Sequence, residues 1–506
     1  MTQIALLPEL EIDLGGAPLT ADEVHAIDEV RVSQRLSAPA QCELAFASPP
    51  GPLARAAAIA TGAAMRVRVR GTETPLFEGQ VTAIESVYGP SGEREVRVRG
   101  YDALHALRKR QTVRAHVQVT ARELAAELTA SLGLRVQADR PGPMWQQVVQ
   151  GEQSDLDLLV ELAGRSGLYL VLREGTLHLL TLEGTGTPLP IALGASLLEA
   201  RAEVNGEPAA RRVEATGWNP LRVEAFEARA SSPQVGRRVI AGSDPARVGG
   251  TGTRVLVDRA VEDPSQAEGL AQSELDRRVA YEVTLWGIAE GDPRLRPGTP
   301  VLVAGLDERL CGKYVLTEVT HTIDSRRGFL SELSTAPPAP PKRPAGARAA
   351  LGVVTRVNDP ENRGRVRVSL PAYRDVESPW LHVLSAGAGE GKGLVILPDR
   401  GDHVLVLLPG GDPSLGVVLG ALYGMRGPHD SGVEGEAVRR YTLRTPGGQQ
   451  VQLDDARNLI RLEDREGSYI EFGPDGFQLH AAVDLLLEAP GRQIVVRGSQ
   501  IDMQKG

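Results

Sequence analysis

Residues 441–480 read YTLRTPGGQQVQLDDARNLIRLEDREGSYIEFGPDGFQLH, and this stretch decides what kind of fold the chain can adopt. Apolar and polar side chains alternate along it, as Ile460 and Leu462 do with Arg461 and Glu463. Alternation with a period of two predicts β-strands. Turn residues interrupt the alternation about every ten positions, so each strand must be short. From here to the C-terminus, turns are expected at 446–448, 454–455, 465–467, 474–476, 490–491 and 497–498.

Strands this short cannot fold over one another to enclose a core within one chain. Three copies wound around a common axis would bury the apolar rows and would leave no free sheet edge. Residues 441–506 therefore predict a homotrimeric β-helix or β-prism, a needle that a single copy cannot form alone.

The segment before the needle predicts a small β-barrel at 351–425. Five expected strands fall within about 75 residues, with Gly and Asp at the turns between them, and this number and spacing fit an OB-fold. The expected strands are residues 352–358, 364–370, 393–397, 403–408 and 416–419. A short connector, 426–440, leads from the barrel to the needle. Proline-rich residues 336–350 predict a semi-rigid linker in front of the barrel.

The first 335 residues predict two further barrels of a hub. Strand alternation marks residues 1–108 as a first hub barrel and 201–335 as a second, which one helix at about 265–280 interrupts. Residues 109–200 between them predict an α/β insertion. The fold class expected for the whole chain is mainly β: β-barrels with a few helices, an OB-fold and a trimeric needle.

Two helices of the insertion are predicted from their capping residues. Thr120 with Glu123 and Ser154 with Asp157 have the three-residue spacing of a capping box at a helix start. A hairpin is expected directly after the second helix, with its turn at Glu174-Gly175.

The composition excludes several classes of protein. Hydrophobic residues make up 42% and charged residues 24% of the 506 residues, as in ordinary globular proteins. A net charge of −9 argues against nucleic acid as a partner. Cys42 and Cys311 belong to no metal or redox motif, and we expect two buried free thiols. No signal peptide and no apolar run of about 18 residues are found, so we expect folding and assembly in a bacterial cytoplasm.

Several motifs suggest chemistry that their spacing does not support. The loop 387–393 contains Gly391-Lys392, but Ala386 and Gly393 stand where a phosphate-binding loop needs Gly and Ser or Thr. The acidic pairs 454–455 and 463–464 are neighbours on a strand, whose side chains point to opposite faces. His480 is the best candidate for a metal ligand on a threefold axis, but an exposed strand histidine explains it better. No catalytic residue, cofactor or metal site is predicted.

Glycines, turn residues and one tryptophan recur in a specific order through the expected barrel. They are Gly352, Asp359, Pro360, Gly364, Arg365, Trp380, Gly401, Asp402, Gly411, Asp412, Pro413, Tyr423 and Gly424. This order strongly resembles the OB domain of VgrG and phage tail-spike proteins, and so many matches argue against chance.

Segments on both sides carry the same resemblance. Residues 445–448 and 453–455 are similar to the start of the family's three-stranded β-helix, and residues 153–159 and 167–170 to its hub domain. The resemblance covers nearly the whole chain. It implies the central hub and membrane-puncturing spike of a contractile injection machine, in a phage tail, a type VI secretion system or a released tail-like particle.

The resemblance also implies the partners of such a spike. They are two further copies of the chain, an Hcp-like tail tube protein, baseplate components and a PAAR-type tip protein, while the target membrane is met only on firing. Ile501 and Met503 would lie near the end that the tip protein covers. A spike without an enzyme domain is expected, because only about fifteen residues separate the OB barrel from the needle.

Two alternatives remain open at this stage. An OB-fold module that binds nucleic acid or glycan would need a basic groove with stacking aromatic residues. A spike-borne cell-wall hydrolase would need an inserted catalytic domain. The barrel offers only Tyr373, Trp380 and Tyr423 for stacking, and there is no room for an insertion.

Overall fold

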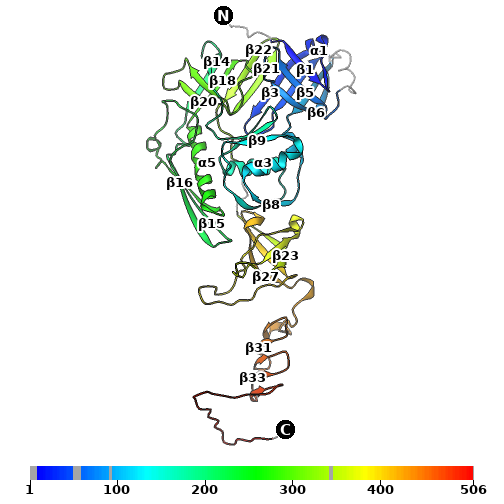
Figure 1. The fold of residues 1–506 in the computed structure, drawn as a ribbon, viewed down its shortest axis with the longest axis vertical. Coiled ribbons are helices and arrows are strands. Elements are labelled where there is room, and N and C mark those ends of the chain that lie inside the picture. The colour runs from blue at the N-terminus through cyan, green and yellow to red at the C-terminus, as the bar shows by residue number, and fades with distance from the viewer. Residues whose placement is uncertain (1–7, 49–58, 91–93, 341–345, 505–506) are drawn as a thin grey trace. The chain divides into compact units, whose positions relative to one another are not determined.

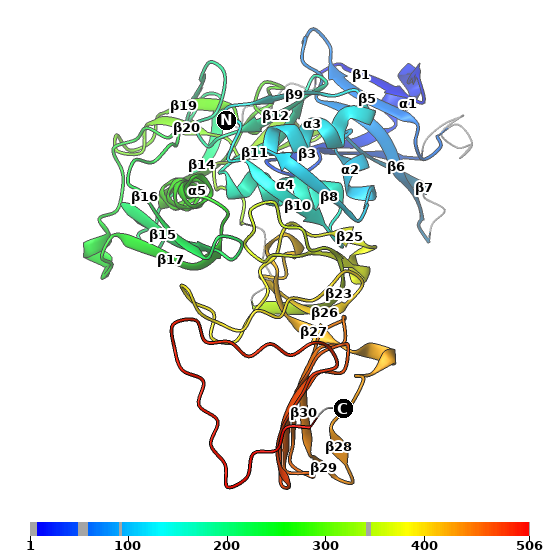
Figure 2. The same cartoon turned by 60° about the horizontal axis from the view of Figure 1, so that its bottom comes forward.

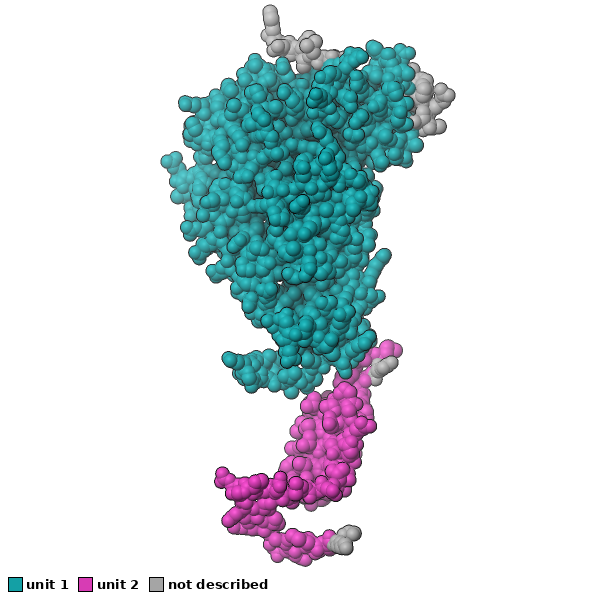
Figure 3. All heavy atoms as spheres, viewed as in Figure 1, with its two compact units in different colours: residues 1–421 teal, residues 422–506 magenta. Residues whose placement is uncertain are grey.

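The computed structural model describes residues 8–48, 59–90, 94–340 and 346–504. The chain forms two compact units, residues 1–421 and residues 422–506, which Figure 3 colours separately. The fold is mainly β, as the sequence predicts, with strands in both units and helices concentrated in the first. Within the described residues, no helix is both long enough and apolar enough to cross a membrane.

An eleven-stranded sheet dominates the first unit, in the order β14-β18-β22-β21-β3-β4-β7-β6-β5-β1-β2. It joins segments from both ends of the hub, because β3 pairs antiparallel with β21. A short helix, α1 (Ala21–His25), precedes β3. The strands are β1 (Leu10–Leu14), β2 (Ala17–Pro18), β3 (Ile27–Arg35), β4 (Gln41–Ala47), β5 (Ala64–Val69), β6 (Phe77–Tyr88), β7 (Arg94–Tyr101), β14 (Leu197–Val204), β18 (Val283–Glu290), β21 (Glu318–Asp324) and β22 (Gly328–Ser334).

The predicted helices of the insertion are confirmed together with their caps. Thr120 caps α3 and Ser154 caps α4, and each shares a reciprocal capping box with the carboxylate three residues on. The predicted hairpin is present as β11 and β12. The elements are α2 (His105–Lys109), β8 (Arg114–Val119), α3 (Ala121–Thr129), the 3-10 helix η2 (Ala130–Leu132), β9 (Arg135–Ala138), β10 (Trp145–Gln150), α4 (Asp155–Arg165), β11 (Tyr169–Arg173) and β12 (Thr176–Leu180).

The rest of the hub holds two three-stranded sheets and the longest helix. Helix α5 packs on the sheet β16-β15-β17, and Figure 1 shows it running beside these strands. A second sheet has the order β13-β19-β20. The elements are β13 (Leu189–Ala192), β15 (Arg212–Asn219), β16 (Glu224–Ala230), η3 (Pro245–Val248), β17 (Thr253–Ala260), α5 (Pro264–Glu282), β19 (Pro300–Ala304) and β20 (Gly312–Val315).

A five-stranded barrel closes the first unit, in the order β25-β24-β23-β26-β27. Bridges from Leu381 to Val366 and from Val383 to Val418 close the sheet on itself. The expected strand at 393–397 is wrong: in a single copy these residues pair with no strand, and the short β25 takes the additional place in the sheet. The elements are β23 (Ala347–Arg356), β24 (Arg367–Leu370), η4 (Pro371–Tyr373), β25 (Val376–Glu377), β26 (His403–Pro409), η5 (Pro413–Leu415) and β27 (Val417–Leu422).

The second unit is a hairpin followed by an antiparallel five-stranded meander, in the order β30-β31-β32-β33-β34. Figure 2 shows its remaining chain, in red, continuing without arrows. The elements are η6 (Gly424–Arg426), β28 (Val433–Glu434), β29 (Ala437–Val438), β30 (Arg440–Arg444), β31 (Gln450–Asp454), β32 (Leu459–Glu463), β33 (Tyr469–Gly473) and β34 (Gly476–His480).

Both cysteines carry free thiols in the structure, Cys42 buried and Cys311 only half-buried. Part of the expected linker, residues 341–345, lies outside the described residues. The last strand of the hub is β22, and the chain is described up to residue 340. The description resumes at Gly346, directly before β23.

Candidate functional site

The five-stranded meander has one apolar face made of two rows of side chains. The strand register places apolar residues directly opposite one another on every pair of neighbouring strands. The first row is Leu443, Val451, Leu462, Ile470 and Leu479, and the second is Tyr441, Leu453, Ile460, Phe472 and Phe477. We call these ten residues the apolar face. A single copy leaves the face open, with Leu462 52% exposed and Phe477 61% exposed.

The opposite face of the meander is polar and is held by its own contacts. Arg461 forms ion pairs with Glu463 at 3.1 Å and with Glu471 at 2.8 Å. Its guanidinium carbon also lies 4.0 Å from the ring centroid of Tyr469, which stacks on His480. The Arg461 and Glu471 side chains are 26% and 20% exposed, which is less than the apolar residues behind them. This inversion of the usual pattern indicates that the apolar face is made to be covered.

Arg440, at the start of β30, fastens the connector to the first strand of the meander through Asp430 and Glu434. Its Nε donates to Asp430 at 2.8 Å, and its Nη1 donates to Glu434. Asp430 also accepts the backbone N–H of Gly432 at 2.8 Å. The Arg440 guanidinium and this N–H lower the pKa of Asp430 to about 2. Gly432 has a φ of 70°, and a Cβ there would clash with the Arg440 carbonyl, so a larger residue is excluded.

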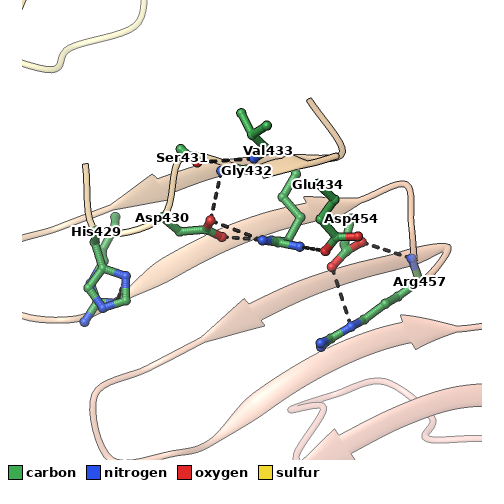
Figure 4. Close-up of polar contacts among 10 residues, drawn as sticks. His429, Asp430, Ser431, Gly432, Val433, Glu434, Asp454 and Arg457 are labelled. Atoms are coloured by element: carbon green, nitrogen blue, oxygen red, sulfur yellow. Dashed lines mark hydrogen bonds and ion pairs between the residues drawn. The ribbon is translucent and has the colours of Figure 1, made fainter. Parts of the chain in front are cut away.

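The acidic pairs of the needle lie at turns. Asp454, at the end of β31, accepts the Arg457 N–H at 3.0 Å, and its Oδ2 lies 4.0 Å from the Arg457 guanidinium (Figure 4). Asp464 accepts the Ser468 N–H at 2.8 Å. These contacts close two turns of the meander. His480 is exposed beside Tyr469 on the polar face.

The candidate tip residues lie in the part of the second unit beyond the meander. Among the described residues 481–504 no strand is formed. Ile501 is 52% exposed and Met503 is 87% exposed. A single copy therefore leaves both side chains available for contact with another chain.

The motif residues of the OB barrel are distributed over its turns and do not converge on one site. Asp359 holds the turn between β23 and β24, where its carboxylate accepts two N–H groups of Arg365 at 2.9 and 2.7 Å. Both side chains are nearly covered, and this contact holds the pKa of Asp359 well below its usual range. Gly364 in the same turn has a φ of 70°, while Pro360 is exposed.

The remaining motif residues also serve the barrel itself. Gly352 lies so close to Val368 that a Cβ would be 2.2 Å from a methyl group of that valine. Asp412 caps η5 by accepting the Ser414 N–H at 2.9 Å, directly after the left-handed Gly411 and before Pro413. Asp402 accepts the Asp399 N–H, beside Gly401 with a φ of 92°.

The three aromatic residues of the barrel that could stack on a ligand do not form a stacking platform. Trp380 is half-buried, with the Arg367 guanidinium carbon 5.2 Å from its ring centroid. Tyr423 is 70% exposed and is followed by Gly424 with a φ of 59°. Tyr373 packs against the barrel core.

Two features of the structure were missed from the sequence. The first is the Arg440 contact set, which joins residues six and ten positions apart with no recognised motif. The second is the exposure of residues 394–397, whose apolar run suggested a strand within the barrel. Among the residues that the structure describes, no group of three His, Cys, Asp or Glu side chains is placed to hold a metal ion.

Two family models match the chain. The type VI secretion system/phage-baseplate injector OB domain matches residues 350–423. The Alg8 N-terminal domain matches residues 57–325, which is more than half of the chain. A curated relative, the type VI secretion system spike protein VgrG4b of Pseudomonas aeruginosa, is 36% identical over 111 residues. That match covers 21% of this chain and only 13% of the relative.

Solved structures have the same fold at low sequence identity. The E. coli c3393 protein, described as a type VI secretion component with structural similarity to phage T4 tail proteins gp27 and gp5, matches with a TM-score of 0.52 and 14% identity. The match covers 81% of this chain and 99% of that one. A chain of the lidded Francisella PdpA-VgrG complex matches with a TM-score of 0.54 and 8% identity, over 94% of this chain and 80% of that one.

The relatives are structural tail and spike proteins, and the OB match falls on the barrel that carries the motif. The Alg8 N-terminal domain match spans most of the hub. The chain therefore belongs to the Alg8 N-terminal domain family and is a VgrG-like hub-spike protein of contractile injection systems.

Proposed function

We propose that this chain is the central hub and membrane-puncturing spike of a contractile injection machine. Three copies would form a hub that joins the tail tube and baseplate, a collar of OB barrels and an intertwined needle. The apolar face of the second unit is the observation that carries the proposal. All of its strands present apolar pairs on one side, and no described apolar residue of that unit is buried.

Other copies of the same unit would bury this face. Each partly exposed side chain of the face, nine of them Val, Leu, Ile or Phe and one Tyr, would contribute about 1 kcal/mol on being covered, so the ten supply on the order of 10 kcal/mol per copy. A threefold arrangement lets the ten residues of each copy meet the same residues of its neighbours around one axis. The polar face, already satisfied by Arg461 and its partners, then remains toward solvent.

The role is mechanical, and no catalysis is assigned to the chain. The work of penetration would come from contraction of a surrounding sheath. A PAAR-type tip protein would cover the end that carries Ile501 and Met503, and an Hcp-like tube protein would contact the hub. Neither nucleic acid nor a cofactor is part of the proposal, and the particle would assemble in the bacterial cytoplasm.

The test is the mass of the full-length protein in solution by light scattering. We expect a trimer of about 162 kDa, three times the chain mass of 54.0 kDa. Leu443→Asp places a charge on the apolar face and should give monomers, whereas Thr442→Asp, its neighbour on the polar face, should leave the trimer intact. A wild-type monomer at micromolar concentration, or equal masses for the two variants, would remove the basis of the proposal.

A further inference from the structure

A loop of the OB barrel, residues 384–397, projects from its own barrel with its apolar side chains uncovered. We call it the arm. Leu394, Val395, Ile396 and Leu397 are 51%, 81%, 54% and 39% exposed, and Leu384 at its other end is 64% exposed. Figure 2 shows the arm as an extended yellow loop ahead of β26 in the chain. Four consecutive apolar residues with this exposure are unusual for a loop.

The base of the arm is fixed, so it leaves the barrel in a defined direction. The Leu394 N–H donates to the Ala386 carbonyl at 3.1 Å, and the Ser385 hydroxyl donates to the Leu394 carbonyl. Pro398 at its end is buried. The glycine-rich tip closes between Gly389 and Lys392, whose backbone groups pair at 3.2 Å. The arm is therefore a narrow hairpin held at its base, and its strand-forming residues 394–397 pair with no described strand of the same copy.

The outer face of the same barrel provides an apolar surface. Along β23 and β26 the inward residues, such as Ala350 and Val406, are buried in the core. The outward residues are also apolar: Leu351 lies opposite Leu405, and Ala349 lies opposite Leu407. An antiparallel sheet usually turns polar residues outward. Leu351 is nevertheless 59% exposed, so the arm of its own chain does not cover it.

We infer that the arm of each copy lies on the outer face of the OB barrel of the next copy, so that three barrels are joined head to tail in a ring. Because the chain carries both the donor and the acceptor surface, the contact is heterologous and closes after three copies. The inference rests on the proposed trimer. About six residues on each side of the hairpin give it a reach of about 20 Å, which is enough to cross onto a neighbouring barrel.

The area that the arm can bury is too small to hold two copies together without the needle. Each half-covered side chain would bury roughly 60 Å², so the five exposed arm residues would bury on the order of 300 Å². The surface that they contact would bury a similar area. The total buried area would be near 600 Å². A stable independent interface buries at least about 1,200 Å². A second copy that is already held by its needle is therefore the occupant that this area fits. An unrelated partner would have to bind through the arm alone.

The experiment uses the full-length chain with Cys311→Ser, so that the fully buried Cys42 is the remaining native thiol. Val395→Cys is labelled with a maleimide in the native protein. Because Val395 is 81% exposed in one copy, we expect labelling in the trimer to be at least about tenfold slower than in a matched chain that also carries Leu443→Asp. Combining Val395→Cys with Leu351→Cys should give covalent trimers on mild oxidation, and each single variant should give none.

The outcomes separate the arm from the proposed trimer. Equal labelling in the trimeric and monomeric chains, with the trimer mass intact, overturns the arm exchange and leaves the proposed function standing. Slow labelling in both chains also overturns it, because the arm would then be covered by its own copy. A disulfide formed within one chain has the same meaning. If the wild-type chain itself is monomeric, the proposed function fails first.

Discussion

Arg440 is the residue whose contacts make the connector a defined structure. It meets Asp430 and Glu434 on a segment that the sequence suggested was only a polar joint. Arg440→Ala should speed amide exchange across residues 430–440 by about tenfold, because two carboxylates and the adjoining hairpin lose their common partner. Arg439→Ala, a change at the exposed neighbour, should leave exchange unaltered. Equal protection in both variants would show that the guanidinium does not order the connector.

Two buried carboxyl groups predict how stability depends on pH. Asp102 accepts the N–H groups of Ala40 and Leu104, and Glu262 accepts that of Gln146. Burial raises the pKa of each group to about 7, above the value near 4 of an unfolded chain. The folded hub therefore keeps protons that the unfolded chain has released, so its free energy of unfolding should fall as pH rises through 7.

The clearest pH window lies between 6.5 and 8.5. In the folded hub His321 is neutral throughout this window, because burial lowers its pKa to about 4. The unfolded histidine, with a pKa near 6.5, loses about half a proton across the window and opposes the carboxyl groups by only about 0.4 kcal/mol. Raising the pH across the window should lower the free energy of unfolding by about 1–2 kcal/mol, measured by urea unfolding at each pH. The Asp102→Asn and Glu262→Gln double variant should lack this dependence. A wild-type protein with the same stability at both ends would contradict the prediction.

At the scale of single elements, the capping boxes offer a direct measurement. Ser154 accepts the Asp157 N–H at 3.2 Å, and its hydroxyl donates to the Asp157 carboxylate at 2.7 Å. Ser154→Ala should lower the free energy of unfolding of the hub by about 1 kcal/mol. Ser154→Thr keeps the hydroxyl and should lose a small part of that amount. Urea unfolding measures the free energy of unfolding of both variants. Equal losses of stability in the two variants would show that packing, and not the cap, causes the effect.

These elements also show what a sequence can predict and why. The starts of α3 and α4 were predicted because capping is local: Thr120 and Ser154 meet carboxylates three residues away. The alternation in β31 and β32 was equally informative, because one apolar face follows from a period of two. The strand at 393–397 was wrong because propensity does not supply a partner. A strand needs a neighbouring edge, and the barrel of one copy offers none to the arm.

At the scale of the whole molecule, the decisive contacts join residues that are far apart in the sequence. The hub sheet is continuous because β3 pairs with β21, and Thr320 reaches Ser33 across 287 positions. No local sequence pattern indicates such a pairing. The sequence therefore predicts the strands but does not predict that both ends of the hub share one sheet. The role of the motif residues is similar. Asp359 and Arg365 were found in sequence, but their paired, nearly covered contact appears only in three dimensions.

The division into two units predicts that folding and assembly can be separated. Every described apolar residue that is buried belongs to the first unit, which holds the hub and barrel cores. The described apolar side chains of the second unit are all at least partly exposed. A chain that ends at Met425 keeps all of β27 and loses the needle. It should unfold within about 2 °C of the hub transition of the full-length protein, because no core residue is removed. It should also be monomeric at micromolar concentration.

Calorimetry and light scattering on the same samples test both parts of this prediction. The arm does not rescue assembly in the shortened chain, since its contact area is below that of a stable interface. A shortened chain that remains trimeric would place the main assembly contacts in the hub or the barrel and would reduce the apolar face to a secondary role. A shortened chain that unfolds far below the full-length protein would instead show that the hub depends on the needle for its stability, in conflict with the separate cores of the first unit.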